Sequence, residues 1–283
     1  KRVLCVDRPD FELTDPEAVD RTVFESHVDL VINTAAYTAV DRAENEAAEG
    51  HAVNREGAAH LASACARQGI PLIHLSTDYV FDGTKRGPYL ETDPVSPVSA
   101  YGKSKAEGEA KVRRRLPDHI ILRTSWLYGV TGRNFVRTML HLGRAQEVLR
   151  VVDDQFGCPT FAGDLAKAVL DMVAVMSRGG TPVWGTYHYC GGGRTTWYGL
   201  AIELFKKART YERFAVRKLV PISTEEFPAS ARRPANSVLD CSLLAKVFGV
   251  QRVPWEKSLS RMLEQYYTAR GLTGSSTKSR SAC

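Results

Sequence analysis

The chain has 283 residues, of which 43% are hydrophobic and 25% charged, a balance typical of globular proteins with a large buried core. The formal net charge of +6 is scattered along the chain apart from short basic runs, so we predict no nucleic-acid partner. No run of about 18 apolar residues and no secretion signal occurs, so we expect no membrane span and a cytoplasmic location. The six cysteines form no CxxC pair, which argues against a zinc site or a disulfide framework.

The first half of the chain alternates between apolar strand patterns and helical patterns. Strands are predicted at residues 3–7, 28–33, 71–75 and 119–123, and helices at 16–26, 52–68 and 100–116. Asp15 is the expected N-cap of the first helix and Pro16 its first residue. This alternation predicts a parallel sheet covered by helices on both faces.

The second half of the chain is less regular. Helices are predicted at 134–143, 162–176, 195–207 and 255–269, and strands at 149–152 and 186–190, both of which could extend the same sheet. Residues 221–254 contain several prolines and are expected to be irregular, substrate-side structure. Residues 270–283 are expected to form a disordered tail.

These elements predict an α/β, Rossmann-like, doubly wound fold with a smaller C-terminal substrate-binding region. We expect a dinucleotide-binding domain over residues 1–190, with parts of 126–148 facing the substrate, and a substrate-binding domain over 191–269. Such a fold normally opens with a strand, a glycine-rich turn and a helix, yet no GxxGxxG pattern occurs in the sequence. We therefore expect residues 3–7 to correspond to the second strand of this fold.

Candidate catalytic residues follow the predicted strand at 71–75. Thr77 would lie at the carboxyl edge of the sheet, where ligands bind in such folds. Tyr101 and Lys105 lie four residues apart on a predicted helix and would share one face. An ammonium beside a phenol favours the phenolate, so we expect Lys105 to lower the pKa of Tyr101 from ~10. Tyr101 could then exchange a proton with a sugar oxygen, while a nicotinamide supplies hydride. The plain alternative is a surface pair on an amphipathic helix.

Several longer sequence segments resemble those of one family. The Tyr101-x-x-x-Lys105 pattern with an upstream threonine resembles the extended short-chain dehydrogenase/reductase superfamily. The segments at 33–41, 76–83, 123–129, 153–160 and 231–237 together resemble the dTDP-4-dehydrorhamnose reductase family, over residues 3 to about 268. The resemblance implies NADPH- or NADH-dependent reduction of the C4 ketone of dTDP-4-dehydro-L-rhamnose, a step that supplies dTDP-L-rhamnose for cell-wall polysaccharide. It also implies a homodimer. The resemblance further implies a use of Mg²⁺, but no residue of this sequence can be assigned as its ligand, so we predict no metal ligand.

The resemblance also implies roles for individual residues. Tyr101 would be the proton donor, Lys105 would bind the nicotinamide ribose, and Thr77 would orient the ketone. Residues that would bind the cofactor are Asp7, Arg8, Glu12, Leu13, Ala35, Ala36, Tyr37, Thr38, Tyr101 and Lys105, and residues that would bind the substrate are Thr77, Asp78, Tyr79, Trp126, Arg232 and Asn236. Asp7 and Arg8 together leave the preference between NAD and NADP undecided, because an acidic residue suits the free ribose hydroxyl and a basic residue suits a 2′-phosphate.

Several alternatives stay open on the sequence. Asp78 could cap a turn, Trp126 could belong to the core, and Arg232 with Arg233 could form a surface pair. A non-catalytic sugar-nucleotide-binding protein, resembling the regulatory subunit of methionine adenosyltransferase, is one alternative function. A nucleotide-sugar epimerase or 4,6-dehydratase is another, which the sequence disfavours because dehydratases follow the threonine with Asp-Glu, whereas Tyr79 follows Asp78 here.

Overall fold

The structure is a computed structural model that describes residues 3–178 and 184–272, and it separates into two compact units. The first unit comprises Lys1–Ser125, Asp171–Tyr189 and Pro228–Val250. The second comprises Trp126–Leu170, Cys190–Phe227 and Gln251–Cys283. The chain thus returns to the first unit twice, and these compact units do not follow the contiguous division at residue 190 expected from the sequence.

The first unit is built on a parallel sheet of four strands. These are β1 (Val31–Asn33), β2 (Leu72–Thr77), β3 (His119–Thr124) and β8 (Gly185–His188), in the order β1-β2-β3-β8. Thr77 pairs in register with Thr124, so β2 and β3 end at the same level. The predicted α/β class with a parallel sheet is confirmed.

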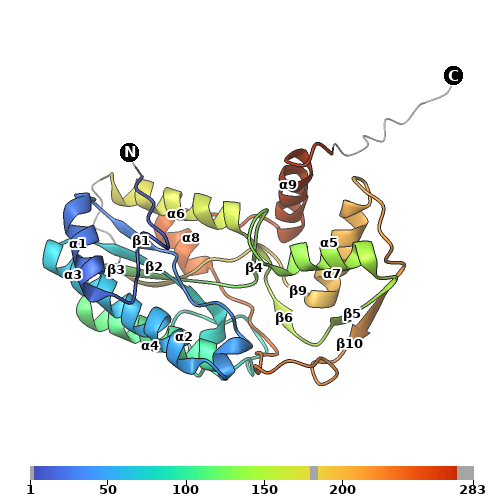
Figure 1. The fold of residues 1–283 in the computed structure, drawn as a ribbon, viewed down its shortest axis with the longest axis horizontal. Helices are drawn as coiled ribbons and strands as arrows, with labels where there is room; N and C mark the ends of the chain where they lie inside the picture. The colour runs from blue at the N-terminus through green and yellow to red at the C-terminus, as the bar shows by residue number, and fades with distance from the viewer. Residues whose placement is uncertain (1–2, 179–183, 273–283) are drawn as a thin grey trace. The chain divides into compact units, whose positions relative to one another are not determined.

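Three helices of the first unit pack side by side and against the sheet. These are α1 (Pro16–Ser26), α3 (Ala58–Gln68) and α4 (Ala100–Arg115), with α3 in contact with both of the others (Figure 1). Helix α1 begins as predicted, because the Asp15 side chain accepts hydrogen bonds from the amides of Glu17 and Ala18. Val19 from α1 and Val112 from α4 are fully buried in one apolar cluster with residues of α3 and β2. A short helix, α8 (Ser242–Phe248), contacts β8.

Two predictions for this unit need correction. Residues 3–7 do not form a strand, and Val3, Leu4 and Val6 are exposed; extended chain becomes a stable strand only with a hydrogen-bonded neighbour, and these residues have none among the strands of the described chain. The helix predicted at 52–68 begins earlier, as α2 (Ala47–His51), passes through the π-helical segment η2 (Ala52–Gly57), and then continues as α3. Short 3₁₀ turns occur at η1 (Arg42–Glu44) and η3 (Asp78–Val80).

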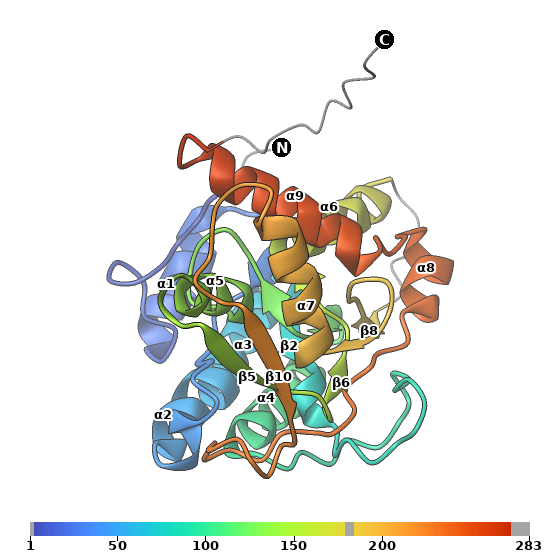
Figure 2. The same cartoon turned by 90° about the vertical axis from the view of Figure 1, so that its right-hand side faces the viewer.

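Within its described residues, the second unit contains three small two-stranded sheets. The pairs are β4 (Leu127–Tyr128) with β7 (Thr160–Phe161), β5 (Val148–Val152) with β10 (Lys218–Ile222), and β6 (Phe156–Gly157) with β9 (Thr195–Thr196). Figure 2 shows β5 and β10 side by side. The strand predicted at 149–152 therefore exists but does not extend the parallel sheet, because its partner is β10. The stretch from 221 to 254 is less irregular than predicted, since it includes the end of β10 and all of α8.

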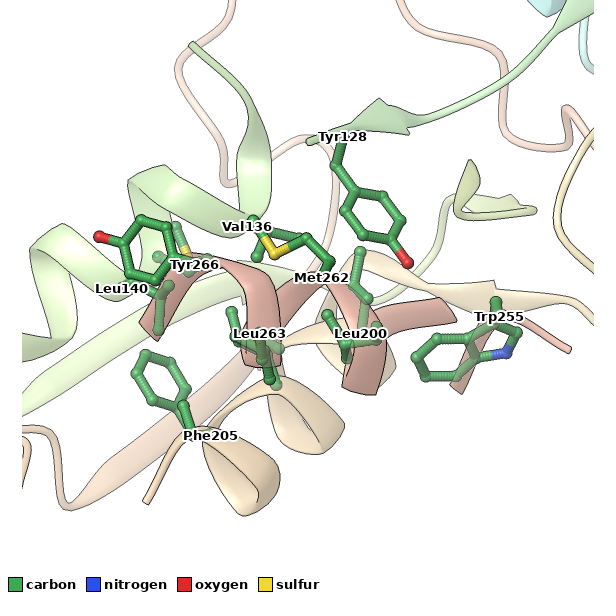
Figure 3. Close-up of a cluster of buried hydrophobic side chains, with 14 of the residues drawn as sticks. Tyr128, Val136, Leu140, Leu200, Phe205, Trp255, Met262, Leu263 and Tyr266 are labelled. Carbon is green, nitrogen blue, oxygen red and sulfur yellow. The ribbon is translucent and has the colours of Figure 1, made fainter. Parts of the chain in front are cut away.

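Helices α5 (Phe135–Ala145), α7 (Trp197–Ala208) and α9 (Trp255–Thr268) enclose the core of the second unit. Figure 3 shows apolar side chains of this core, among them Leu140 from α5, Leu200 from α7 and Leu263 from α9. Burial of such side chains is the main force that holds the unit together. Helix α6 (Ala162–Met176) has the bounds predicted from the sequence. In the part of the chain that the structure describes, no helix has the length and hydrophobicity needed to cross a bilayer.

Candidate functional site

Thr77 and Asp78 lie at the carboxyl end of β2, where the strand turns into η3. Thr77 caps this turn: its Oγ1 accepts a hydrogen bond from the Tyr79 amide at 3.2 Å and donates to Asp78 Oδ1 at 3.1 Å. The Asp78 side chain is buried, with 2% of the residue exposed. Burial raises the pKa of Asp78 to about 6, although hydrogen bonds from the Ser237 and Thr77 hydroxyls oppose the rise.

The first turn of α4 brings Tyr101 to this strand end. Ser99 caps the helix by accepting a hydrogen bond from the Gly102 amide at 3.1 Å. Gly102 is needed for close approach, because a Cβ there would lie 2.2 Å from the carbonyl oxygen of Tyr79. The rings of Tyr79 and Tyr101 meet edge to face with centroids 5.6 Å apart, and the Thr77 hydroxyl interacts electrostatically with Tyr101.

Lys105, one helical turn further along α4, reaches the same strand. Its Nζ donates to the carbonyl oxygen of Leu75 at 2.7 Å, and only 2% of the residue is exposed. The structure therefore brings Thr77, Tyr101 and Lys105 together around the end of β2, and the interpretation of Tyr101 and Lys105 as a surface pair does not hold. Both side chains are buried.

The electrostatics of this cluster differ from the sequence-based expectation. Burial raises the pKa of Tyr101 to about 12. The neighbouring Thr77 hydroxyl lowers this pKa, and the charge of Asp78 raises it further. Lys105 was expected to lower this pKa, but burial also lowers the pKa of Lys105 to about 8, opposed by the charge of Glu109. The Lys105 charge is not among the main influences on the Tyr101 pKa, and burial keeps Tyr101 a protonated phenol at neutral pH.

A buried ion pair lies one further helical turn behind Lys105. Glu109 accepts hydrogen bonds from Arg123 Nε at 2.8 Å and from Arg123 Nη2 at 2.7 Å, and both residues are almost completely buried. Burial alone would raise the pKa of Glu109, yet the Arg123 hydrogen bonds and charge lower it to about 2. Sequence analysis missed this pair, because nothing in the spacing of Glu109 and Arg123 shows that the helix and the strand meet there.

Most of the predicted cofactor residues line one cavity of the first unit, whereas Tyr101 and Lys105 are not among its lining residues. The cavity has a volume of about 470 Å³, within the usual range for small-molecule sites. Its lining includes eight of the predicted residues: Asp7, Arg8, Glu12, Leu13, Ala35, Ala36, Tyr37 and Thr38. Glu12 is held ionised, because hydrogen bonds from Arg8 and Thr14 lower its pKa to about 2.

The loop that carries Ala36 and Tyr37 is fixed by a residue that sequence analysis missed. Asn54, in η2, accepts from the Tyr37 amide at 2.9 Å and donates to the Tyr37 carbonyl oxygen at 3.0 Å. The same side chain donates to Ser104 Oγ on α4 at 2.9 Å. A buried asparagine inside a helical pattern was the available signal, since such side chains are normally hydrogen-bonded.

The segment from 231 to 237 returns to the first unit and holds the turn after β2. Arg233 donates to Asp41 Oδ2 at 2.7 Å, and its guanidinium interacts electrostatically with Tyr79. Asn236 donates to the carbonyl oxygens of Lys85 and Gly87, at 2.7 and 3.0 Å, so its amide is used within the protein. Arg232 is exposed. Of the two neighbouring arginines considered from the sequence, Arg233 rather than Arg232 interacts with a candidate site residue, Tyr79.

Trp126 belongs to the second unit and has an unusual backbone. Its φ of 49° lies in the left-handed region, which costs a bulky residue conformational energy and is often found at functional sites. Its indole stacks on Trp197 with centroids 3.5 Å apart, and a Cβ on Gly157 would overlap the indole at 2.2 Å. Trp126 packs against the core and is also partly exposed, so a role in the core does not exclude a role in substrate binding.

Comparison with known proteins agrees with this arrangement. A family model described as RmlD substrate binding domain matches residues 1–268. The dTDP-4-dehydrorhamnose reductase of Sinorhizobium fredii is 44% identical over 264 residues, which cover 92% of this chain and 88% of that protein. The chain belongs to the RmlD family.

Solved structures support the RmlD assignment. The dTDP-4-dehydrorhamnose reductase of Clostridium acetobutylicum is 39% identical with a TM-score of 0.85, and covers 92% of this chain and 89% of its own. The Bacillus anthracis reductase, solved in complex with NADP, is 36% identical with a TM-score of 0.83 and the same coverage. A dTDP-glucose 4,6-dehydratase of Streptomyces venezuelae is 22% identical with a TM-score of 0.71, a likeness that extends to the fold alone.

Proposed function

We propose that this RmlD-family chain reduces the C4 ketone of dTDP-4-dehydro-L-rhamnose to the alcohol of dTDP-L-rhamnose, with NADPH or NADH as the reductant. The observation that carries the proposal is the convergence of Thr77, Tyr101 and Lys105 on the carboxyl end of β2. The relatives named dTDP-4-dehydrorhamnose reductase, at 44% and 41% identity, support the choice of substrate. The Bacillus anthracis complex with NADP supports the choice of cofactor.

The residues around the 470 Å³ cavity fit a dinucleotide. Asp7 or the ionised Glu12 suits a ribose hydroxyl, and Arg8 suits a 2′-phosphate, because an acid accepts from hydroxyls and a guanidinium donates to phosphate oxygens. Ala35 and Ala36 are small residues that allow a ligand to approach the backbone of their loop. When bound, the reduced nicotinamide supplies the hydride that the ketone carbon needs.

Tyr101 supplies the proton. Hydride addition at C4 leaves a negative charge on O4, and transfer of the phenolic proton from Tyr101 Oη completes the alcohol. A pKa of about 12 keeps Tyr101 protonated before the reaction, which suits a proton donor. Lys105, with a pKa of about 8, is mainly an ammonium at neutral pH and would stabilise the phenolate that the transfer leaves behind.

The remaining candidates position the substrate. Thr77, Asp78 and Tyr79 would contact the sugar, and Trp126 with Arg232 and Asn236 would contact the nucleotide sugar as the family resemblance implies. Arg233 would act indirectly, by holding Tyr79 against Tyr101. No group of three or more His, Cys, Asp or Glu side chains that could hold a metal occurs among the described residues, so we derive no step through Mg²⁺.

The proposal is tested by NAD(P)H oxidation that depends on added dTDP-4-dehydro-L-rhamnose, with the product identified by mass and NMR. Binding of the nucleotide sugar without turnover would instead support a regulatory sugar-nucleotide-binding protein. Release of water or epimerised product without consumption of NAD(P)H would support a dehydratase or an epimerase. We also propose a cytoplasmic location and a homodimer, and size-exclusion chromatography tests the homodimer.

A further inference from the structure

Two buried cysteines of the second unit contact the same arginine. Cys158 lies between β6 and β7, and Cys190 begins the segment with which the chain re-enters this unit. The Arg252 Nη2 atom donates to Cys158 Sγ at 3.6 Å and to Cys190 Sγ at 3.4 Å. The two sulfurs are therefore no further apart than these two distances taken together. Both cysteines are reduced in the structure, and both are 0% exposed.

The backbones that carry these cysteines are also in direct contact. The Gly191 amide donates to Thr160 Oγ1 at 3.2 Å, and a Cβ on Gly191 would clash with the carbonyl oxygen of Pro159. Arg252 holds one of the two segments, because its Nε donates to the Cys190 carbonyl oxygen at 3.1 Å and its Nη2 donates to that of Gly191. A disulfide needs Cα atoms about 4.4–6.8 Å apart, and segments whose backbones touch can reach this separation with a small movement.

Arg252 adds a chemical property to the pair. The nucleophile in thiol oxidation is the thiolate, and a neighbouring guanidinium stabilises this anion. Arg252 is itself partly exposed, so the cluster lies close to the surface of its unit. A second thiol beside the first converts the initial oxidation product, a sulfenic acid, into a disulfide. The three side chains together have the composition of a redox-sensitive site.

The cysteine pair adjoins a residue that the proposed function uses. Cys158 follows Gly157, which packs so closely on the Trp126 indole that a Cβ there would overlap the ring. Gly191, which follows the other cysteine, packs beside Trp255, and a Cβ on it would lie 3.3 Å from the Trp255 Cβ. A bond between the two sulfurs would draw their segments together. It would therefore shift the backbone on which the Trp126 indole rests.

We propose that Cys158 and Cys190 form a redox-sensitive pair, which hydrogen peroxide converts to a disulfide that weakens binding of the nucleotide sugar at Trp126. One thiolate attacks a peroxide oxygen, the O–O bond breaks, and the departing hydroxide takes up the thiol proton to form water. The second thiol then attacks the sulfenic sulfur, so that the S–S bond forms, the S–O bond breaks and a second water leaves. The thiols lose two electrons and the peroxide gains them. The effect on sugar binding rests on the proposed reductase function, whereas formation of the disulfide does not.

The chemical test is peptide mass spectrometry of the whole protein after treatment with hydrogen peroxide, with remaining thiols alkylated before digestion. The peptides that contain Cys158 and Cys190 should be joined with the loss of both thiol hydrogens, and dithiothreitol should separate them. This measurement needs no variant. Cys158→Ser and Cys190→Ser should each abolish the linked species, whereas Cys241→Ser, the same change at another buried cysteine, should keep it.

A second test measures the consequence for Trp126. In the oxidised protein, KM for dTDP-4-dehydro-L-rhamnose should rise roughly tenfold with kcat nearly unchanged, because the proposed proton-transfer residues belong to the first unit. Tryptophan emission should change on oxidation, because Trp126 and Trp255 both adjoin backbone that the disulfide moves. Dithiothreitol should reverse both effects. Peroxide-treated Cys158→Ser, the control, should keep the KM and the emission of its untreated form.

The tests separate the ways in which the inference can fail. Thiols that stay reduced at both positions, or that oxidise separately without a link, would overturn the disulfide. A linked protein with unaltered emission and KM would overturn the effect on Trp126. If the reduced protein oxidises no NAD(P)H with the ketosugar, the reductase proposal is wrong, whereas linked peptides with altered emission would still establish a redox-sensitive pair.

Discussion

Replacement of Glu109 by glutamine should strongly destabilise the first unit. The change removes the partner of Arg123, which is 1% exposed and makes hydrogen bonds of 2.8 and 2.7 Å to the Glu109 carboxylate. A buried guanidinium that loses its counter-ion keeps its desolvation cost without the compensating attraction, and the typical penalty is about 3–5 kcal/mol. With a urea m-value of about 3 kcal/mol/M, the midpoint of unfolding should fall by roughly 1–1.7 M.

The assay is equilibrium urea unfolding followed by far-UV circular dichroism, with Glu109→Gln/Arg123→Met as the matched control. The double variant removes both charges and should be less destabilised than the single variant, because no buried charge is left unpaired. A single variant within about 1 kcal/mol of the unsubstituted protein, or a double variant less stable than the single one, would refute the reasoning.

The same variant has a predictable pH dependence. The pKa of Glu109 is lowered to about 2 in the folded chain, so its stabilisation is fully present above the unfolded value of about 4.3 and is lost as the pH falls toward about 2. The difference in unfolding free energy between Glu109→Gln and the unsubstituted protein should therefore shrink on acidification. A difference that stays constant between about pH 6 and about pH 3 would contradict the assignment of this shift to Glu109.

Three further predictions concern the catalytic cluster. Tyr101→Phe should lower kcat by ~10² or more and leave the urea midpoint nearly unchanged, and an undiminished kcat would remove Tyr101 from the mechanism. Gly102→Ala should cost about 1–3 kcal/mol of unfolding free energy, because its Cβ would lie 2.2 Å from the Tyr79 carbonyl oxygen; unaltered stability in the urea assay would show that the close approach is not real. Arg233→Met should lower kcat/KM by roughly tenfold through a loosened Tyr79, whereas Arg233→Lys should recover part of it, and equal kinetics for both variants would contradict the contact.

Local signals in the sequence predicted much of the fold. Asp15 and Pro16 placed the start of α1, and the helical periodicity placed α6 at its observed bounds, because caps and periodicity act within a few residues. The strand predicted at 3–7 failed because a strand depends on a neighbour that the local pattern cannot reveal. The strand at 149–152 was found, but its pairing with β10 is a long-range property.

The sequence predicted which residues form the candidate site better than it predicted their electrostatics. The four-residue spacing placed Tyr101 and Lys105 on one face, and the strand end placed Thr77 beside them. The direction of the Tyr101 pKa shift was predicted wrongly, because burial, which the local sequence does not show, raises this pKa. The contact of Arg233 with Asp41 joins positions almost two hundred residues apart, and no spacing rule in one sequence reports such a meeting.

The return of residues 228–250 to the first unit bears on how the protein is made. During synthesis, the turn that carries Tyr79 emerges from the ribosome well before Arg233, and Gly83 before Pro234, against which it packs. The order of translation thus separates the parallel sheet from the segment that braces its catalytic edge. A nascent chain that stops short of this segment would carry every proposed proton-transfer residue and still lack the segment that braces them. We therefore expect catalytic activity to appear only once this segment has been made, and not to grow steadily with chain length.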